Sequence, residues 1–347
     1  MITLNGQHGE GGGALVRTAL ALSTVTGKEF TVINIRSGRT QPGLKAQHLH
    51  AINALKEICG AETNEIKLGS TQLQYKPGKI KSGTYDINIG TAGSITLLLQ
   101  ALILPCLHAP SKVTLNITGG TCGKWQASVD YLQQVLLPHL RKFAKSIDLK
   151  ILKRGYYPKG GGEIMLEISP KKMETLPVIT LIKQGKLEQI KGRINLSREL
   201  QEPDIGERVV RAASSHLKKW NVPVNIDVEY SNALSVGGEI LLWTVFSKDG
   251  EVDQENPTIL GASVLLEKGK SSETVGKEVA QQLNENIASE FPVDEHLADQ
   301  LIQFMEPGSK VHAKISEHTK TNTHIAEQFL PIEFEIEQNK ITVRKVL

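Results

Sequence analysis

The chain has 347 residues, 39% of them hydrophobic and 22% charged, which is typical of a globular protein with one insertion-bearing domain or two domains and excludes disorder. Its 3 cysteines are widely spaced, which argues against a disulfide framework or a zinc site, and a formal net charge of +3 is too small to predict wrapping of long nucleic acid. No apolar run approaches the roughly 18 residues of a membrane span, and the N-terminus begins as a strand instead of a signal peptide, so we expect a cytoplasmic protein with no membrane partner.

Two similar units with glycine-rich turns are predicted in the first half of the chain. The first unit has a glycine-rich turn at 9–13, a helix over 14–24, a strand over 30–35 and a helix over 46–58. The second unit repeats this order about 80 residues later, with a strand over 85–89, a helix over 94–107, a strand over 112–118 and a helix over 129–143.

A third unit is predicted to be interrupted. It begins with a strand over 162–168, breaks off, and resumes with helices over 273–288 and 295–305 and a strand over 310–315. The intervening segment has alternating strands over 189–196, 224–230, 240–246 and 258–266, and a helix over 204–220 with apolar residues at helical spacing. The sequence therefore predicts an α/β (α+β) fold with a large domain of three repeated units, 1–181 and 272–347, and a small inserted α/β domain, 182–271.

One histidine lies where it could act as a nucleophile. His318 falls between the predicted strand 310–315 and a short helix expected to start near Thr323. Neutral imidazole exposes a lone pair near pH 7, because its unperturbed pKa is about 6.5, and the amides of a helix start favour a phosphate beside it. This placement suits nucleotidyl transfer, although a surface histidine in a strand-to-helix loop would give the same pattern.

The predicted helix 295–305 separates an apolar face from a polar one. Its apolar residues fall on the core side: Leu297, Leu301, Phe304 and Met305. Its polar residues share the other side: His296, Asp299, Gln300 and Gln303. The polar stripe fits either a ligand site or an ordinary solvated helix face.

Motifs spread nearly end to end make the chain resemble the RNA 3′-terminal phosphate cyclases. They follow the family order: Gly9-Glu10-Gly11-Gly12-Gly13 with Arg17; residues 35–39 with 42–44; residues 90–94 with Gln100; residues 119–121; residues 157–162; residues 296–300; and residues 318–322. Several motifs in one order are more specific than any single glycine-rich loop. The resemblance implies repeated units like those of the initiation-factor-3 C-terminal domain and the enolpyruvyl transferases.

The resemblance also implies a three-step reaction. A histidine attacks the α-phosphate of ATP, the adenylyl group passes to an RNA 3′-phosphate, and the ribose 2′-OH closes a 2′,3′-cyclic phosphate with release of AMP. By match to the family motifs, His318 is the adenylated histidine, and Glu10 is a candidate ligand for a divalent metal, Mg²⁺ or Mn²⁺. The ATP-site residues that it implies are Gln100, His296, Leu297, Ala298, Asp299 and Gln300, with Arg17, Arg36 and Arg39 as phosphate contacts. The implied partner is an RNA with a 3′-terminal phosphate, and the oligomeric state is open.

Other roles stay open for several of these residues. Gln100 could instead cap a buried turn, Glu10 could favour a helix dipole, and each arginine could be solvated or paired to a carboxylate. The basic stretch 141–159 surrounds Tyr156 and Tyr157 and fits either RNA contact or a solvated strand and loop.

The chain departs from the family pattern at two places. Residues 122–128 replace an acidic or amide residue and a proline-containing stretch, and His296 stands where tyrosine is frequent. Trp125 could supply stacking in place of a lost hydrogen bond. Two other functions remain: a catalytically inactive cyclase-like protein of ribosome assembly, which His318 argues against, and an enolpyruvyl transferase, for which fold analogy is the only warrant.

Overall fold

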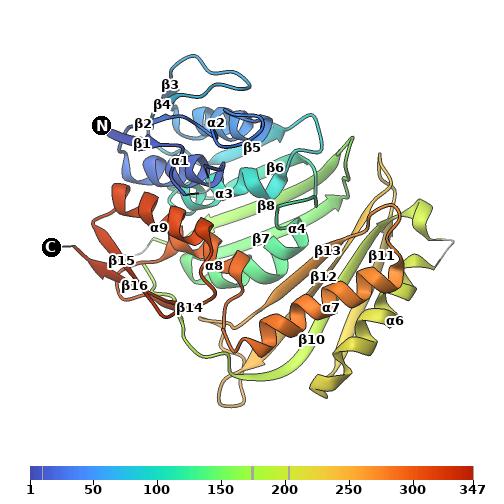
Figure 1. The fold of residues 1–347 in the computed structure, drawn as a ribbon. Helices are drawn as coiled ribbons and strands as arrows, with labels where there is room; N and C mark the ends of the chain where they lie inside the picture. Colours follow the sequence, from blue (N-terminus) through green and yellow to red (C-terminus); the bar gives the residue numbers. More distant parts are fainter. Residues whose placement is uncertain (10, 173–175, 202–203, 347) are drawn as a thin grey trace.

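The computed structural model describes residues 1–9, 11–172, 176–201 and 204–346. Figure 1 shows a mixed α/β molecule in which both ends of the chain form a large body and the segment coloured yellow to orange forms a smaller body beside it. The described residues form four four-stranded sheets, three in the large body and one in the smaller. Within those ranges no helix combines the length and apolar character needed to cross a bilayer.

The N-terminal sheet has the order β1-β2-β4-β3. Its strands are β1 (Ile2–Asn5), β2 (Phe30–Ile33), β3 (Glu62–Thr63) and β4 (Leu73–Lys76), with the helices α1 (Ala14–Thr26) and α2 (Ala46–Cys59). β1 and β2 are parallel, and β4 is antiparallel to both of its neighbours. Helix α1 is buried on most of its sides, which explains why its residues other than Arg17 are apolar or carry only a small hydroxyl side chain.

The second sheet has the order β5-β6-β8-β7. Its strands are β5 (Gly83–Asn88), β6 (Val113–Gly119), β7 (Ala144–Lys153) and β8 (Gly162–Pro170), with α3 (Ile95–Leu107) and a helical segment over 129–143 that includes α4 (Val129–Tyr131) and α5 (Leu137–Leu140). The expectation that residues 162–168 open a third unit is wrong, because β8 pairs with β6 and β7 and completes this sheet.

The C-terminal sheet has the order β9-β14-β16-β15. Its strands are β9 (Thr180–Leu181), β14 (Lys310–His312), β15 (Ile332–Glu337) and β16 (Lys340–Lys345), with the helices α8 (Glu295–Leu301) and α9 (Glu317–Phe329). β9 and β14 are parallel, and β16 is antiparallel to both of its neighbours, which is the pairing pattern of the two preceding sheets. The chain leaves this sheet after β9 and returns to it after the smaller body.

The smaller body has its own sheet and its own hydrophobic core. Its strands are β10 (Lys186–Ser197), β11 (Val224–Ser231), β12 (Gly238–Ser247) and β13 (Gly261–Leu265), with the helices α6 (Ile205–Leu217) and α7 (Ser272–Ala288). Val275, Val279 and Leu283 of α7 pack in this second core. This packing argues for extending the inserted domain, which the sequence analysis ends at residue 271, to Ala288.

Helix α9 begins six residues earlier than the sequence analysis expects, and this changes the setting of His318. Ser316 caps the helix, since its hydroxyl accepts from the Thr319 amide at 2.9 Å and its amide donates to Thr319 Oγ1 at 3.3 Å. The reciprocal cap favours a helix start at Glu317. His318 therefore lies in the first turn of α9 and not in a strand-to-helix loop.

A buried ion-pair network joins the two bodies. Arg154, which follows β7, binds Asp130 of the large body and donates to Glu229 of β11 at 2.9 and 2.7 Å. The side chains of Arg154 and Asp130 are 2% and 1% exposed. Asn195 of β10 also donates to Asp130, at 3.2 Å. These contacts fix the inserted domain against the helical segment 129–143.

Candidate active site

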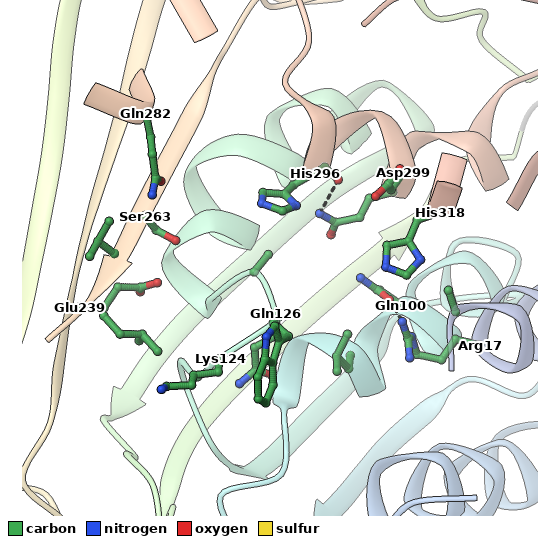
Figure 2. A pocket seen from close by; sticks show the side chains of 18 of the residues that line it. Arg17, Gln100, Lys124, Gln126, Glu239, Ser263, Gln282, His296, Asp299 and His318 are labelled. Atoms are coloured by element: carbon green, nitrogen blue, oxygen red, sulfur yellow. Dashed lines mark hydrogen bonds between the residues drawn. The ribbon is translucent and has the colours of Figure 1, made fainter. Parts of the chain in front are cut away.

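A cavity of about 640 Å³ lies between the large body and the inserted domain. Figure 2 shows His318 and Arg17 on one side of it and Glu239 and Gln282 on the other. The cavity brings together most of the polar residues that the sequence predicts for the site: Arg17, Gln100, His296, Asp299, Gln300 and His318. Helices α1, α3, α8 and α9 supply these residues, so the site forms where helices that accompany all three sheets of the large body meet.

The glycine-rich turn passes directly beside the first turn of α9. A side chain at Gly12 would place its Cβ 3.9 Å from His318 Cε1 and 3.3 Å from Arg39 Nη2. Gly9 has a φ of +62°, and a Cβ there would overlap with the Thr321 hydroxyl. Glycine is therefore needed at position 9 for the close approach of this turn to Thr321 of α9, while Gly12 lies at ordinary contact distance from His318.

Asp299 connects α8 to the start of α9. Its Oδ1 accepts from Ser316 Oγ at 2.5 Å and from Thr319 Oγ1 at 2.6 Å, and its carbonyl accepts from Asn322 Nδ2 at 2.9 Å. Burial raises the pKa of Asp299, while these hydroxyls and His318 act in the opposite direction. The carboxylate thus holds the cap and the first turn that carry His318.

Gln100 orients Arg17. The Arg17 Nε donates to Gln100 Oε1 at 2.7 Å, and the Gln100 carbonyl accepts from Gln303 Nε2 at 3.2 Å. The neighbouring Thr18 donates to Asn322 Oδ1 at 2.9 Å, which ties α1 to α9. The guanidinium of Arg17 is therefore fixed on the same side of the cavity as His318.

Cations gather around the glycine-rich turn. Burial, followed by repulsion from Arg36, lowers the pKa of Arg17 to about 10. Burial and Arg39 lower the pKa of Arg36, whose Nη1 donates to the carbonyls of Gln41 and Gly43 at 3.0 and 3.3 Å. Burial and the nearby cations lower the pKa of His48 to about 3. Such crowding creates a positive potential that an anion would relieve.

Some residues named from the sequence do not reach the cavity wall. Leu297 and Ala298 are fully buried in the large hydrophobic core. Arg39 borders the glycine-rich turn and Arg36 is near enough to Arg17 to lower its pKa, but neither arginine lines the cavity. Glu10 lies outside the described residues. Among the residues that are described, no group of three or more His, Cys, Asp or Glu side chains could hold a metal ion.

His296 is exposed at the mouth of the cavity. Its ring meets the ring of Tyr131 edge-on, with centroids 6.4 Å apart. Tyr131 in turn donates to Asp294, the cap of α8, at 2.6 Å. His296 thus keeps an aromatic surface at this position, where the sequence departs from the family pattern.

The sequence analysis missed the wall that the inserted domain supplies. Glu239 of β12, Ser263 of β13 and Gln282 of α7 all line the cavity. Glu239 is 2% exposed, and its Oε2 has no hydrogen-bond partner. Burial, followed by repulsion from Asp130, raises its pKa to about 8. The sequence does show a glutamate directly before the apolar run 240–246, which hints at a buried carboxyl group. No local pattern, however, shows that this glutamate faces His318 across a cavity.

Comparisons with known proteins cover nearly the whole chain, including all the cavity residues described above. The family model described as "RNA 3'-terminal phosphate cyclase" matches residues 8–336. The chain is 38% identical to the RNA 3'-terminal phosphate cyclase of Methanopyrus kandleri, over 97% of this chain and 95% of that protein. It is 37% identical to the one of Archaeoglobus fulgidus, over 99% and 100%, and 39% identical to the one of Pyrococcus abyssi, over 97% and 95%. The chain therefore belongs to the RNA 3'-terminal phosphate cyclase family.

Proposed function

We propose that this chain is an ATP-dependent RNA 3′-terminal phosphate cyclase. It would convert an RNA 3′-phosphate to a 2′,3′-cyclic phosphate and release AMP and pyrophosphate. The observation that carries the proposal is the setting of His318, in the first turn of α9, beside a glycine-rich turn and a cluster of arginines, and on a cavity large enough for a nucleotide. The family membership and the names of the relatives support the same activity.

The first step forms a phosphoramidate. A ring nitrogen of His318 attacks the α-phosphorus of ATP, the new P–N bond forms, and the P–O bond to pyrophosphate breaks. Arg17, fixed by Gln100, is placed to stabilise the charge that develops on the phosphates, and Arg36 and Arg39 extend this positive region. Asp299 positions the nucleophile through Ser316 and Thr319.

Two further steps use the stored activation. An oxygen of the RNA 3′-phosphate attacks the phosphorus of the histidine adenylate, the P–N bond breaks, and RNA and AMP become joined by a phosphoanhydride. The ribose 2′-oxygen then attacks the RNA phosphorus, loses its proton, and displaces AMP. The first two steps carry the activation of ATP to the RNA 3′-phosphate, so that cyclisation expels AMP, a good leaving group, instead of hydroxide.

A divalent ion, Mg²⁺ or Mn²⁺, would arrive on the triphosphate, since Mg²⁺ in such sites is held largely by substrate phosphates and water. Bound there, it would neutralise charge on the departing pyrophosphate. Among the described residues, no cluster of three or more His, Cys, Asp or Glu side chains could hold such an ion without the triphosphate.

The test is covalent labelling with ATP that carries the label on its α-phosphate. We expect label on the wild-type protein and none on His318→Ala. His324→Ala is the matched control, because His324 lies on the same helix but stacks on His8, 4.0 Å between ring centroids, outside the cavity lining. An RNA with a 3′-phosphate should discharge the label and yield a cyclic end.

Label that persists in a folded His318→Ala protein would reject the assignment of the nucleophile. A wild-type protein that takes up no label with any divalent metal would favour the binding scaffold, the catalytically inactive reading. A circular dichroism melt of each variant establishes that loss of label does not reflect unfolding.

A further inference from the structure

A second cavity, of about 610 Å³, adjoins the first. The two cavities share the segment 123–126 of the large body and Leu265 and Glu267 of the inserted domain. Lys124 and Glu267 form an ion pair of 2.6 Å across this shared wall. A ligand seated in the second cavity would therefore lie next to a nucleotide bound beside His318.

Two large aromatic side chains of the second cavity are exposed. Trp125 is 96% exposed and Tyr157 is 80% exposed, whereas Tyr156 is buried and donates to Asn195 at 2.9 Å. Of the two tyrosines that the sequence analysis considered for RNA contact, only Tyr157 is thus accessible. Two bare rings on one cavity form a hydrophobic surface that is unusual without a ligand.

The backbone of Trp125 is held in an unfavourable conformation. Its φ is +60°, a region that non-glycine residues adopt rarely and at a cost of roughly 1–3 kcal/mol. Packing does not explain this, because the side chain is almost fully exposed. A strained residue that presents a bare indole beside a reaction site is the kind of outlier from which a binding role is inferred.

An exposed cation, Lys159, lies two residues from Tyr157 without itself lining the cavity. Lys159 follows Tyr157 and Pro158, is exposed, and makes no ion pair within the described ranges. Its amide donates to Ser235 Oγ at 3.2 Å, which attaches this loop to the inserted domain. Val236 and Gly237, from the same connection, line the cavity. The aromatic faces of the cavity thus lie near an exposed cation that is available to a backbone phosphate.

We propose that the nucleotides preceding the 3′-phosphate of the RNA substrate bind in this second cavity, with bases stacked on Trp125 and Tyr157. The inference rests on the proposed function. The 3′-phosphate must reach the adenylate on His318 while AMP fills the first cavity, so the RNA has to enter from an adjoining site. Stacking accepts any base, because every base has a π face, and Lys159 contacts the backbone. The site would therefore recognise a single-stranded 3′ end with little sequence preference.

Direct binding tests the proposal without catalysis. The probe is a single-stranded RNA of about eight nucleotides with a 3′-phosphate and a 5′ fluorophore, measured by anisotropy against the His318→Ala protein. We expect Trp125→Ala and Tyr157→Ala, each added to this background, to weaken binding by about tenfold. Phenylalanine at either position should restore most of the affinity. Leu68→Ala is the control, an apolar residue that is 63% exposed and lines neither cavity.

A second measurement separates this inference from the proposed function. With His318 intact, Tyr157→Ala, at a residue that lines only the second cavity, should keep the wild-type rate of labelling by ATP and raise the KM for RNA in the discharge step. If the wild type takes up no label, the proposed function fails, yet the anisotropy experiment still decides whether RNA binds here. Unchanged RNA affinity in both alanine variants would overturn the second cavity as the RNA site.

Discussion

At the scale of single residues, Glu239 is a cavity side chain whose environment moves its pKa far from the ordinary value. Its pKa is raised from 4.5 to about 8, first by burial and then by Asp130. A raised pKa means that the folded state is favoured in acid: this stability is complete below pH 4.5 and is lost as the pH rises through 8. Between pH 5 and pH 8 the loss is on the order of 3 kcal/mol.

Glu239→Gln should remove this dependence, because an amide does not titrate. We expect urea unfolding of the wild type to lose more stability between pH 5 and pH 8 than unfolding of the variant, by on the order of 3 kcal/mol. Glu333→Gln, at an exposed position of β15, serves as the control and should follow the wild type. Parallel pH profiles for the wild type and Glu239→Gln would show that Glu239 ionises freely in the folded protein.

At the scale of elements, the first turn of α9 is the part whose geometry the chemistry depends on. Ser316→Ala removes the hydroxyl that accepts from the Thr319 amide and donates to Asp299. Loss of such a cap costs about 1 kcal/mol. Because His318 follows two residues later, we expect the rate of labelling at saturating ATP to fall at least tenfold, with the KM for ATP changed less.

Ser271→Ala provides the matched comparison. Ser271 caps α7 in the same way, accepting from the Thr274 amide at 3.1 Å, but it is exposed and does not line the cavity. It should lose a similar amount of stability, measured by urea unfolding, and keep its labelling rate. Full labelling by both variants would mean that the cap does not orient the nucleophile.

The helices and strands also show how much of the fold local sequence patterns can predict. Sequence patterns located α1, α2, α3, β5 and β6 to within a few residues, because each is a continuous local run bounded by glycine or polar turn residues. They assigned β8 to the wrong unit, since a strand's pairing partner is not written in its own sequence. The helix over 273–288 was predicted correctly, but in the large domain, whereas α7 packs in the core of the smaller body. A helical pattern does not show which of two cores the helix packs against.

At the scale of the whole molecule, the site depends on docking of the inserted domain. Motifs in the large body named the residues around His318, because each motif is a short local segment. Glu239, Ser263 and Gln282 escaped notice because they meet the cavity only when the inserted domain is in place. Trp125 and Tyr157 were each named from the sequence as possible stacking residues, but their joint cavity was not predicted, because segments from both bodies form it.

The network around Arg154 is the contact that fixes this docking. Arg154→Ala would leave Asp130, only 1% exposed, with part of its charge uncompensated, and we expect a loss of about 3–5 kcal/mol in the free energy of unfolding. Arg208→Ala breaks a surface pair with Glu273, whose side chains are 41% and 58% exposed, and should cost at most about 1 kcal/mol. Denaturant unfolding of both variants makes the comparison.

The same substitution should affect the site, because the wall carrying Glu239 and Ser263 would no longer be held against the large body. We therefore expect Arg154→Ala to raise the KM for ATP in the labelling reaction, at a temperature where the protein remains folded, while Arg208→Ala leaves it unchanged. Since each body has its own hydrophobic core, separate thermal transitions should also emerge in Arg154→Ala. A single transition together with an unaltered KM would show that the Arg154 network does not keep the inserted domain docked. The packing of β12 and β13 against the helical segment 129–143 would then be the contact that does so.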